Sequence, residues 1–161
     1  MKILSMPIIL LAALLLAMAT PLAGTTAHAA APGTSSGSFQ FANSVVNDSR
    51  SAGPNTFYTL TNTITTTGTF VGTLVCHERQ LVKANGAAES HDRCVFTGRV
   101  DGHSGTAVLG IQSSGAADGT SHGHFAVRSG GTGGLAGLRG QGTFAGKADG
   151  SGTYSGKFHF E

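Results

Sequence analysis

A glycine-rich stretch close to the C-terminal end, Ser129–Phe144, limits what this chain can fold into more than any other segment. It holds seven glycines, yet Leu135, Leu138 and Phe144 interrupt them. A flexible linker of this composition would lack those apolar side chains. Glycines among apolar residues are instead typical of strands that bend sharply or lie close to a neighbouring backbone. The stretch therefore predicts part of a strongly curved β-sheet.

The same glycines resemble a nucleotide-binding loop, an interpretation that their surroundings exclude. Gly131 and Gly133 would need a strand before them and a helix after them, so that a phosphate could sit on the helix N-terminus. Residues 135–142 contain three further glycines, and each glycine in a helix interior costs about 1 kcal/mol. The sequence Gly-Lys-Ser/Thr does not follow either. We therefore expect no nucleotide at this stretch.

The N-terminal segment, residues 1–29, has the pattern of a secretory signal peptide. A positively charged start at Lys2 precedes the apolar run Ile3–Met18, and small residues stand at Ala27 and Ala29. Signal peptidase cleaves after such small residues, so we expect cleavage after Ala29. The apolar run is shorter than the ~20 residues of a membrane span. We therefore expect a secreted or periplasmic protein that has no membrane anchor after cleavage.

Composition favours a β-domain and gives no sign of a nucleic-acid partner. The chain has ten Lys and Arg against eight Asp and Glu, and these cations do not gather into a basic stripe. Its 25 glycines and many threonines, with few helix formers, indicate an all-β fold. After the signal peptide we expect a disordered arm over residues 30–37. Residues 38–161 then form a single domain. The sequence does not specify an oligomeric state.

Turn residues recur at short intervals, and apolar side chains alternate with polar ones between them, as at Tyr154, Phe158 and Phe160. This spacing is typical of all-β domains. The predicted strands are Gly37–Val46, Phe57–Thr66, Thr69–Leu81, His91–Val100, Thr106–Gln112, Thr120–Val127, Leu135–Phe144 and Gly152–Phe160. Eight sequential strands joined by short turns favour an antiparallel up-and-down barrel, whose closure removes exposed sheet edges. A β-sandwich is the alternative.

The two cysteines, Cys76 and Cys94, are predicted to form a disulfide, because paired cysteines in exported proteins are usually oxidised. Gly86 marks a three-residue hairpin loop between the strands that carry them. Such a loop makes Lys83 face Ala87, and in that register Cys76 lies opposite Cys94. The alternative is a reduced pair that serves as metal ligands.

Two runs, Phe96–Thr106 and Ser129–Phe144, resemble the bacterial DUF3224 family, and the resemblance extends roughly from Thr59 to Phe160. The family is similar in fold to allene oxide cyclase and plant dirigent proteins. The resemblance therefore implies an eight-stranded antiparallel barrel with an internal cavity and no cofactor. It implies no reaction, because the function of the family is unknown. The export signal and the cysteine pair depart from the usual family pattern.

The predicted hairpin register also places Glu78 opposite Asp92, on the face that carries Leu74, Phe96 and the disulfide. Two facing carboxylates repel each other, and a shared site of low dielectric constant raises the pKa of one of them. A carboxylic acid with a raised pKa can act as a general acid. The alternative is that both groups reach water, because hairpin ends are usually solvated.

The opposite face of this hairpin is basic. It carries His77, Arg79, His91 and Arg93, which the same register brings close together. These four side chains either lie exposed to solvent or bind an anion.

His122 and His124 lie on one face of a predicted strand. They could hold Zn²⁺ or Cu²⁺ if His103 or His159 supplied a third ligand, but no spacing in the sequence shows that they meet. One alternative is a polar outer face with Phe125 pointing inward. The other is that His124 points into the cavity and acts as an acid or base.

Apolar side chains of the predicted barrel either line its cavity or fill it. The residues in question are Leu74, Phe96, Phe125, Tyr154 and Phe158. We expect the cavity to bind a small apolar or phenolic molecule. A cofactor-free isomerase or cyclase of the allene oxide cyclase or dirigent type, with Glu78, Asp92 or His124 as its acid or base, is the second hypothesis. A fully packed structural or interaction protein is the third.

Overall fold

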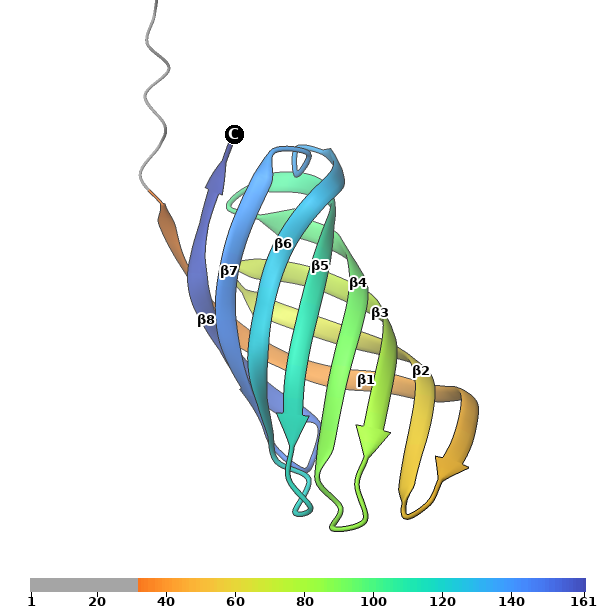
Figure 1. Ribbon diagram of the computed structural model, residues 1–161. Helices are drawn as coiled ribbons and strands as arrows, with labels where there is room; N and C mark the ends of the chain where they lie inside the picture. Colours follow the sequence, from red (N-terminus) through yellow and green to blue (C-terminus); the bar gives the residue numbers. More distant parts are fainter. Residues whose placement is uncertain (1–31) are drawn as a thin grey trace, which may run out of the picture.

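The computed structural model describes residues 32–161, which form eight β-strands and no helix (Figure 1). The predicted signal peptide, residues 1–29, lies outside the described residues. The strands are β1 (Gly33–Ala52), β2 (Asn55–Gly68), β3 (Phe70–Val82), β4 (Ala88–Val100), β5 (His103–Gly115), β6 (Ser121–Gly133), β7 (Leu138–Gly146) and β8 (Ser151–Phe160). This part of the chain therefore offers no helix that is long and apolar enough to cross a membrane.

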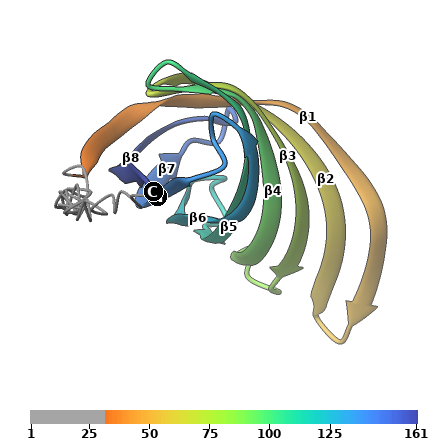
Figure 2. The ribbon, with the colours of Figure 1, turned by 90° about the horizontal axis from the view of Figure 1, so that it is seen from above.

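The strands form one closed barrel, in which each strand pairs with its neighbours in the chain and β1 pairs with β8. Every pairing is antiparallel. The sheet curls round until its first and last strands meet (Figure 2). The predicted up-and-down barrel is confirmed, and the sandwich alternative is wrong. Side chains that alternate along each strand point inward and outward in turn, so the inward set decides what the barrel contains.

The first strand begins inside the arm predicted over residues 30–37. Residues Gly33–Gln40 pair with β8, so that prediction is wrong from Gly33 onward. Gly37 shows why a glycine- and serine-rich segment is ordered here. A Cβ at this position would lie 1.9 Å from the carbonyl oxygen of Thr67. The glycine thus allows a backbone approach that a side chain would prevent.

Beyond Gln40, β1 leaves β8 and continues as a long hairpin with β2. Residues 41–52 of β1 pair with residues 55–64 of β2, and this hairpin extends past the other strands (Figures 1 and 2). Register shifts after Phe41 and after Val46 bend the strand. The β1–β2 hairpin therefore forms one edge of this end of the barrel, which we call the mouth.

Apolar side chains and the β6–β7 connection close the opposite end. Leu135 and Leu138 are among the largest fully buried side chains, together with Phe96 and Val100. The N–H of Leu135 donates to the carbonyl of Thr132, and the N–H of Leu138 donates to the carbonyl of Leu135, so the chain turns tightly here. The strand that we predicted from Leu135 therefore begins at Leu138.

The β3–β4 hairpin has the predicted register. The N–H of Lys83 donates to the carbonyl of Ala87 over 2.8 Å, and Gly86 has a φ of 80°, which favours glycine. Cys76 consequently faces Cys94, and the two are joined in a disulfide. The predicted disulfide is confirmed, and the alternative of a reduced metal-binding pair is wrong.

Candidate functional site

The inward side chains enclose a cavity of about 290 Å³. All eight strands contribute to its wall, which reaches Gln80, Ala88, Gly115 and Ser121 at the ends of the hairpins. The cavity therefore extends from the closed end of the barrel toward the mouth. The interior of an eight-stranded barrel is just wide enough for side chains to fill it or for one small ligand to bind.

Aromatic rings form the inner end of the cavity. Phe70, Phe125 and Tyr154 line it, and the Tyr154 ring meets the other two edge-on, with ring centres 5.9 Å and 6.3 Å away. Edge-to-face contacts of this length stabilise aromatic clusters. Leu74 and Ile111 extend the apolar wall toward the mouth.

The hydroxyl of Tyr154 ties this aromatic floor to the turn between β2 and β3. It accepts a hydrogen bond from the N–H of Phe70 at 2.8 Å and donates one to the carbonyl of Thr67 at 2.9 Å. Burial raises the pKa of the Tyr154 hydroxyl. The hydroxyl therefore links two parts of the backbone, because it donates one hydrogen bond to the backbone and accepts another from it.

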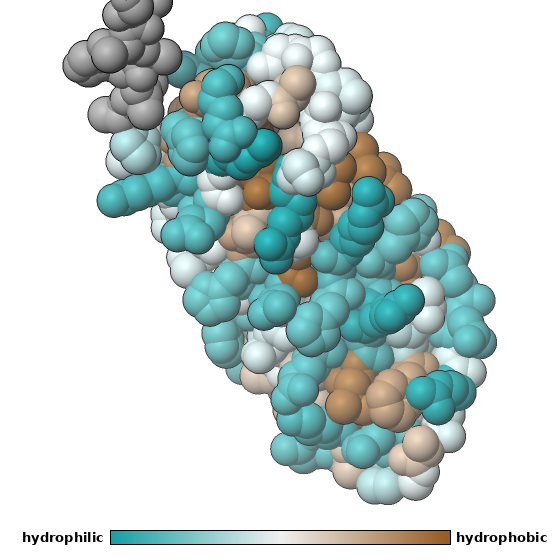
Figure 3. Space-filling model, turned by 45° about the horizontal axis from the view of Figure 1, so that its top comes forward, coloured by the Kyte–Doolittle hydropathy of each residue, from teal (hydrophilic) through white to brown (hydrophobic). Residues whose placement is uncertain are grey.

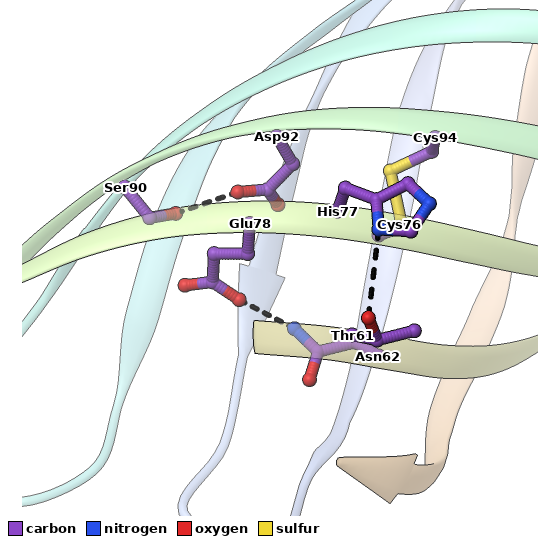
Figure 4. Close-up of a disulfide and its surroundings, with 8 residues drawn as sticks. All are labelled: Thr61, Asn62, Cys76, His77, Glu78, Ser90, Asp92 and Cys94. Atoms are coloured by element: carbon purple, nitrogen blue, oxygen red, sulfur yellow. Dashed lines mark hydrogen bonds between the residues drawn. A yellow bond between two sulfur atoms is a disulfide. The ribbon is translucent and has the colours of Figure 1, made fainter. Parts of the chain in front are cut away.

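The polar part of the cavity is built around two carboxylates. Glu78 on β3 lies directly opposite Asp92 on β4, as the predicted register required, and both line the cavity. Glu78 is 8% exposed. The side-chain amides of Asn62 and Gln80 each donate to one of its oxygens, the latter over 3.1 Å. Figure 4 shows the two carboxyl groups on the same side of the hairpin, with Asn62 reaching Glu78 from β2.

Asp92 is held less tightly than Glu78. Ser90 donates to its Oδ1 over 3.1 Å (Figure 4), and Ser90 is itself linked to Ser113 on β5 at 2.8 Å. Burial, and then the charge of Glu78, raise the pKa of Asp92 to about 7. Burial also raises the pKa of Glu78, against the hydrogen bonds that lower it. The pair can therefore keep a proton near neutral pH, when isolated carboxyls have lost theirs.

The disulfide lies next to this acid pair, on the same inward face (Figure 4). Cys76 and Cys94 are both 0% exposed. They join β3 to β4 one inward position deeper than Glu78 and Asp92. The covalent link therefore fixes the separation of the two strands where they present their carboxyl groups.

The histidines lie outside the barrel. His122 and His124 are exposed on the outer face of β6, whereas Phe125, the next residue on the same strand, points inward. The alternative in which His124 acts from within the cavity is therefore wrong. Among residues 32–161, no three His, Cys, Asp or Glu side chains gather closely enough to hold a metal, so His103 and His159 do not join the pair in one site.

The basic residues of the β3–β4 hairpin also face outward. His77 lies opposite Arg93 and Arg79 lies opposite His91, and all four are exposed. The register brings them together as predicted. Whether they bind an anion stays a prediction.

Five apolar residues were candidates for the cavity wall, and the structure divides them. Leu74, Phe125 and Tyr154 lie in the wall, whereas Phe96 and Phe158 are buried in the core away from it. The placement of Phe96 and Phe158 in the cavity is therefore wrong. Both rings pack at the closed end, where they fill space rather than enclose it.

Sequence reasoning missed the hydrogen-bonding shell of the acid pair. Asn62 was the residue most open to prediction, because it is polar and lies on the inward face of β2, two positions before the apolar Ile64. Its contact with Glu78 follows only once the β2–β3 register is known. Gln80 and Ser90 are the next inward pair after the carboxylates and could have been found from the hairpin register alone.

Together the fold and the cavity define a small antiparallel barrel with a buried acid pair. The chain belongs to the family described as "Protein of unknown function (DUF3224)", whose model matches residues 35–158. It is similar to the crystal structure of a DUF3224-family protein of unknown function from Shewanella oneidensis MR-1. The two are 19% identical with a TM-score of 0.68, and the match covers 81% of this chain and 99% of that one. At this identity the likeness shows the shared fold. No curated protein matches the chain.

Proposed function

We propose that this protein binds a small, largely apolar molecule inside its barrel. The observation that carries the proposal is the cavity of about 290 Å³, whose wall combines aromatic and aliphatic side chains with polar ones that include Glu78 and Asp92. Ligand sites of soluble proteins have this composition, and their volumes start near 300 Å³. A compact ligand of one ring or a short branched chain fits this space. The cavity also favours binding over the hypothesis of a fully packed structural barrel.

A cofactor-free isomerase or cyclase is the second candidate, and the buried acid pair favours it. Two carboxyl groups whose environments differ can divide acid and base roles between them. Asp92, with its pKa of about 7, would give a proton to an oxygen of the substrate, while ionised Glu78 would receive the proton that leaves carbon. The resemblance to allene oxide cyclase and dirigent barrels points the same way.

Ligand-observed NMR with p-cresol and 2-phenylethanol tests the cavity as the binding site. Ile111 lines the cavity, whereas its neighbour Gln112 is exposed on the outer face of β5. We expect wild-type protein and Gln112→Trp to bind the probes and Ile111→Trp to lose them, because the indole fills the cavity. Equal binding by both variants would show that the probes bind elsewhere. The test measures binding and does not require that the protein converts the probe. It therefore locates the site whether the protein is a binding protein or an enzyme.

We also propose that the protein is exported. The support is the signal-peptide pattern of residues 1–29 together with the Cys76–Cys94 disulfide, since disulfides persist mainly outside the cytosol. Mass spectrometry of the culture medium and periplasm of an expressing bacterium should find a chain that begins at Ala30. Finding only the full-length chain in the cytosol would contradict the proposal.

A further inference from the structure

We propose that the ligand of this cavity carries a protonated amine, which Glu78 and Asp92 hold between them, on a compact apolar body. This inference rests on the proposed function and deepens it, because it names the chemical class that the cavity selects. It replaces the apolar or phenolic molecule of the sequence-based hypothesis with a cationic one.

The two carboxylates have no counter-charge among the described residues that line the cavity. No Lys, Arg or His side chain belongs to the wall of the cavity within the described residues. The groups that face the two carboxylates from the surrounding strands are all neutral: Leu60 and Asn62 on β2, Gln80 on β3, Ser90 on β4, and Ile111 and Ser113 on β5. The only further titratable group in the wall is Tyr154, whose hydroxyl is bound to the backbone. The negative charge of the pair is therefore uncompensated.

The pair also has unused hydrogen-bonding capacity. Glu78 accepts from Asn62 and Gln80, and Asp92 accepts from Ser90. Two ionised carboxylates offer about eight lone-pair positions, and these three donors leave most of them free. An ammonium group brings three N–H donors on one atom, whereas a phenol or alcohol brings one. The amine therefore satisfies the site better than a neutral ligand of the same shape.

Binding of an ammonium ion would also lower the free energy of the charged pair. A buried carboxylate without a partner is costly, and a second carboxylate opposite it adds repulsion. The cavity relieves this in the free protein by retaining a proton, which is why the pKa of Asp92 rises. An ammonium ion relieves it more fully, because it cancels the charge and supplies donors at once. The same field repels a ligand that carries a carboxylate.

The remaining walls define the body of the ligand. Phe70, Leu74, Leu109 and Phe125 surround the space on the side away from the carboxylates. These four side chains have no hydrogen-bonding groups, and the hydroxyls of Thr66 and Tyr154 in the same wall already bond to the backbone. A molecule with one amine at one end and a ring or branched alkyl group at the other therefore fits, whereas a polyamine or a sugar leaves polar groups without partners.

Three compounds with one carbon skeleton test this inference: 2-phenylethylamine, 2-phenylethanol and phenylacetate. They present an ammonium, a hydroxyl and a carboxylate on the same phenyl body. In calorimetric titrations of the oxidised mature protein at pH 8, we expect the amine to bind at least tenfold more tightly than the alcohol. Phenylacetate should not bind measurably. Binding of the amine should tighten between pH 6 and pH 8 as the pair loses its proton, while binding of the alcohol stays constant.

The double variant Glu78→Gln/Asp92→Asn removes both charges and keeps the shape of the site. We expect its amine-to-alcohol affinity ratio to fall close to one, with its affinity for the alcohol within about twofold of wild type. Glu89→Gln is the matched control, because Glu89 lies on the outer face of β4, where it pairs with Lys83. This control should keep the wild-type ratio. If the double variant fails to fold, Asp92→Asn alone should lower the ratio.

Alcohol binding as tight as amine binding in wild type would overturn the inference and leave the proposed function standing. A ratio that survives in the double variant would also overturn it, because the amine would then be recognised elsewhere. If p-cresol binds and Ile111→Trp abolishes that binding, but the amine does not bind, the inference fails alone. If none of the probes binds to wild-type protein, the proposed function fails and the inference fails with it.

Discussion

Cys76 and Cys94 face each other across β3 and β4, and the next inward pair toward the mouth is Glu78 with Asp92. The inward pair on the other side of the disulfide is apolar. The hairpin therefore changes from packed core to polar cavity wall within a few residues, and the covalent link lies at the boundary. The face of the molecule seen in Figure 3 is mostly hydrophilic, with separate apolar areas.

The first prediction concerns this disulfide. It joins residues that are 18 positions apart in the chain, and closing a loop of that size stabilises a protein by about 3 kcal/mol. The double variant Cys76→Ala/Cys94→Ala should therefore melt roughly 10 °C below oxidised wild type. Calorimetry measures the shift, and reduced wild-type protein is the control, since it loses the same link. A change of less than about 2 °C in both would show that the pairing of β3 with β4 holds without it.

The second prediction concerns the dependence of stability on pH. Asp92 loses its proton near pH 3.8 when unfolded and near pH 7 when folded, so between these values the folded state binds more protons. Its contribution to the free energy of unfolding therefore falls as pH rises through this window, by at most about 1.4 kcal/mol per pH unit, and levels off above pH 7. Glu78, whose pKa is also raised, acts in the same direction. Urea unfolding at pH 5, 6, 7 and 8 measures the slope.

Asp92→Asn should flatten this slope and should be more stable than wild type at pH 8, because the buried charge is gone. Asp118→Asn is the control. Hydrogen bonds from Thr120 lower the pKa of the exposed Asp118 carboxyl, so that group is ionised in both states above pH 5 and its removal leaves the slope unchanged. A wild-type stability that rises from pH 5 to pH 8 would contradict the raised pKa of Asp92.

Local turn chemistry made the β3–β4 hairpin predictable from the sequence. Gly86 fixes the loop, the loop fixes the register, and the register fixes both the disulfide and the Glu78–Asp92 pair. The side chains follow because inward and outward positions alternate along a strand. The identity of the fold was equally accessible, since it needed only the number of strands and their short connections.

The contents of the cavity and the start of β1 could not be predicted, because both depend on contacts between strands that are far apart in the sequence. Whether Phe96 fills the core or lines a cavity depends on which end of the barrel is closed, and the buried Leu135 at that end lies outside the hairpin. The arm predicted over residues 30–37 failed for the same reason. Its glycines and serines carry no apolar pattern, and only the arrival of β8 alongside them turns Gly33–Gln40 into a strand.

The third prediction concerns the hydroxyl of Tyr154, which connects β8 to residues more than 80 positions earlier in the chain. Tyr154→Phe keeps the ring but leaves the N–H of Phe70 and the carbonyl of Thr67 without this partner. Loss of a buried partner costs about 1–3 kcal/mol, so the free energy of unfolding should fall by that amount. The hydroxyl of Tyr58 makes no hydrogen bond to another described residue, so Tyr58→Phe should change the free energy of unfolding by less than about 0.5 kcal/mol. Equal effects of the two variants would mean that the link is not stabilising.

The fourth prediction concerns the close approach of β6, β7 and β8 in the glycine-rich stretch. A Cβ at Gly142 would lie 2.2 Å from the carbonyl oxygen of Ser155 and 2.5 Å from the ring of Phe125. Gly142→Ala should therefore destabilise the barrel by about 1–3 kcal/mol. It should also disturb the cavity, because Phe125 lies in its wall. At Gly115 the nearest atom would be 3.6 Å away, so Gly115→Ala should be neutral or slightly stabilising.

Urea unfolding of both variants, with p-cresol binding as a second measurement, distinguishes the two positions. If Gly142→Ala were as stable as Gly115→Ala and bound p-cresol like wild type, glycine at this position would not be what allows the strands to pack.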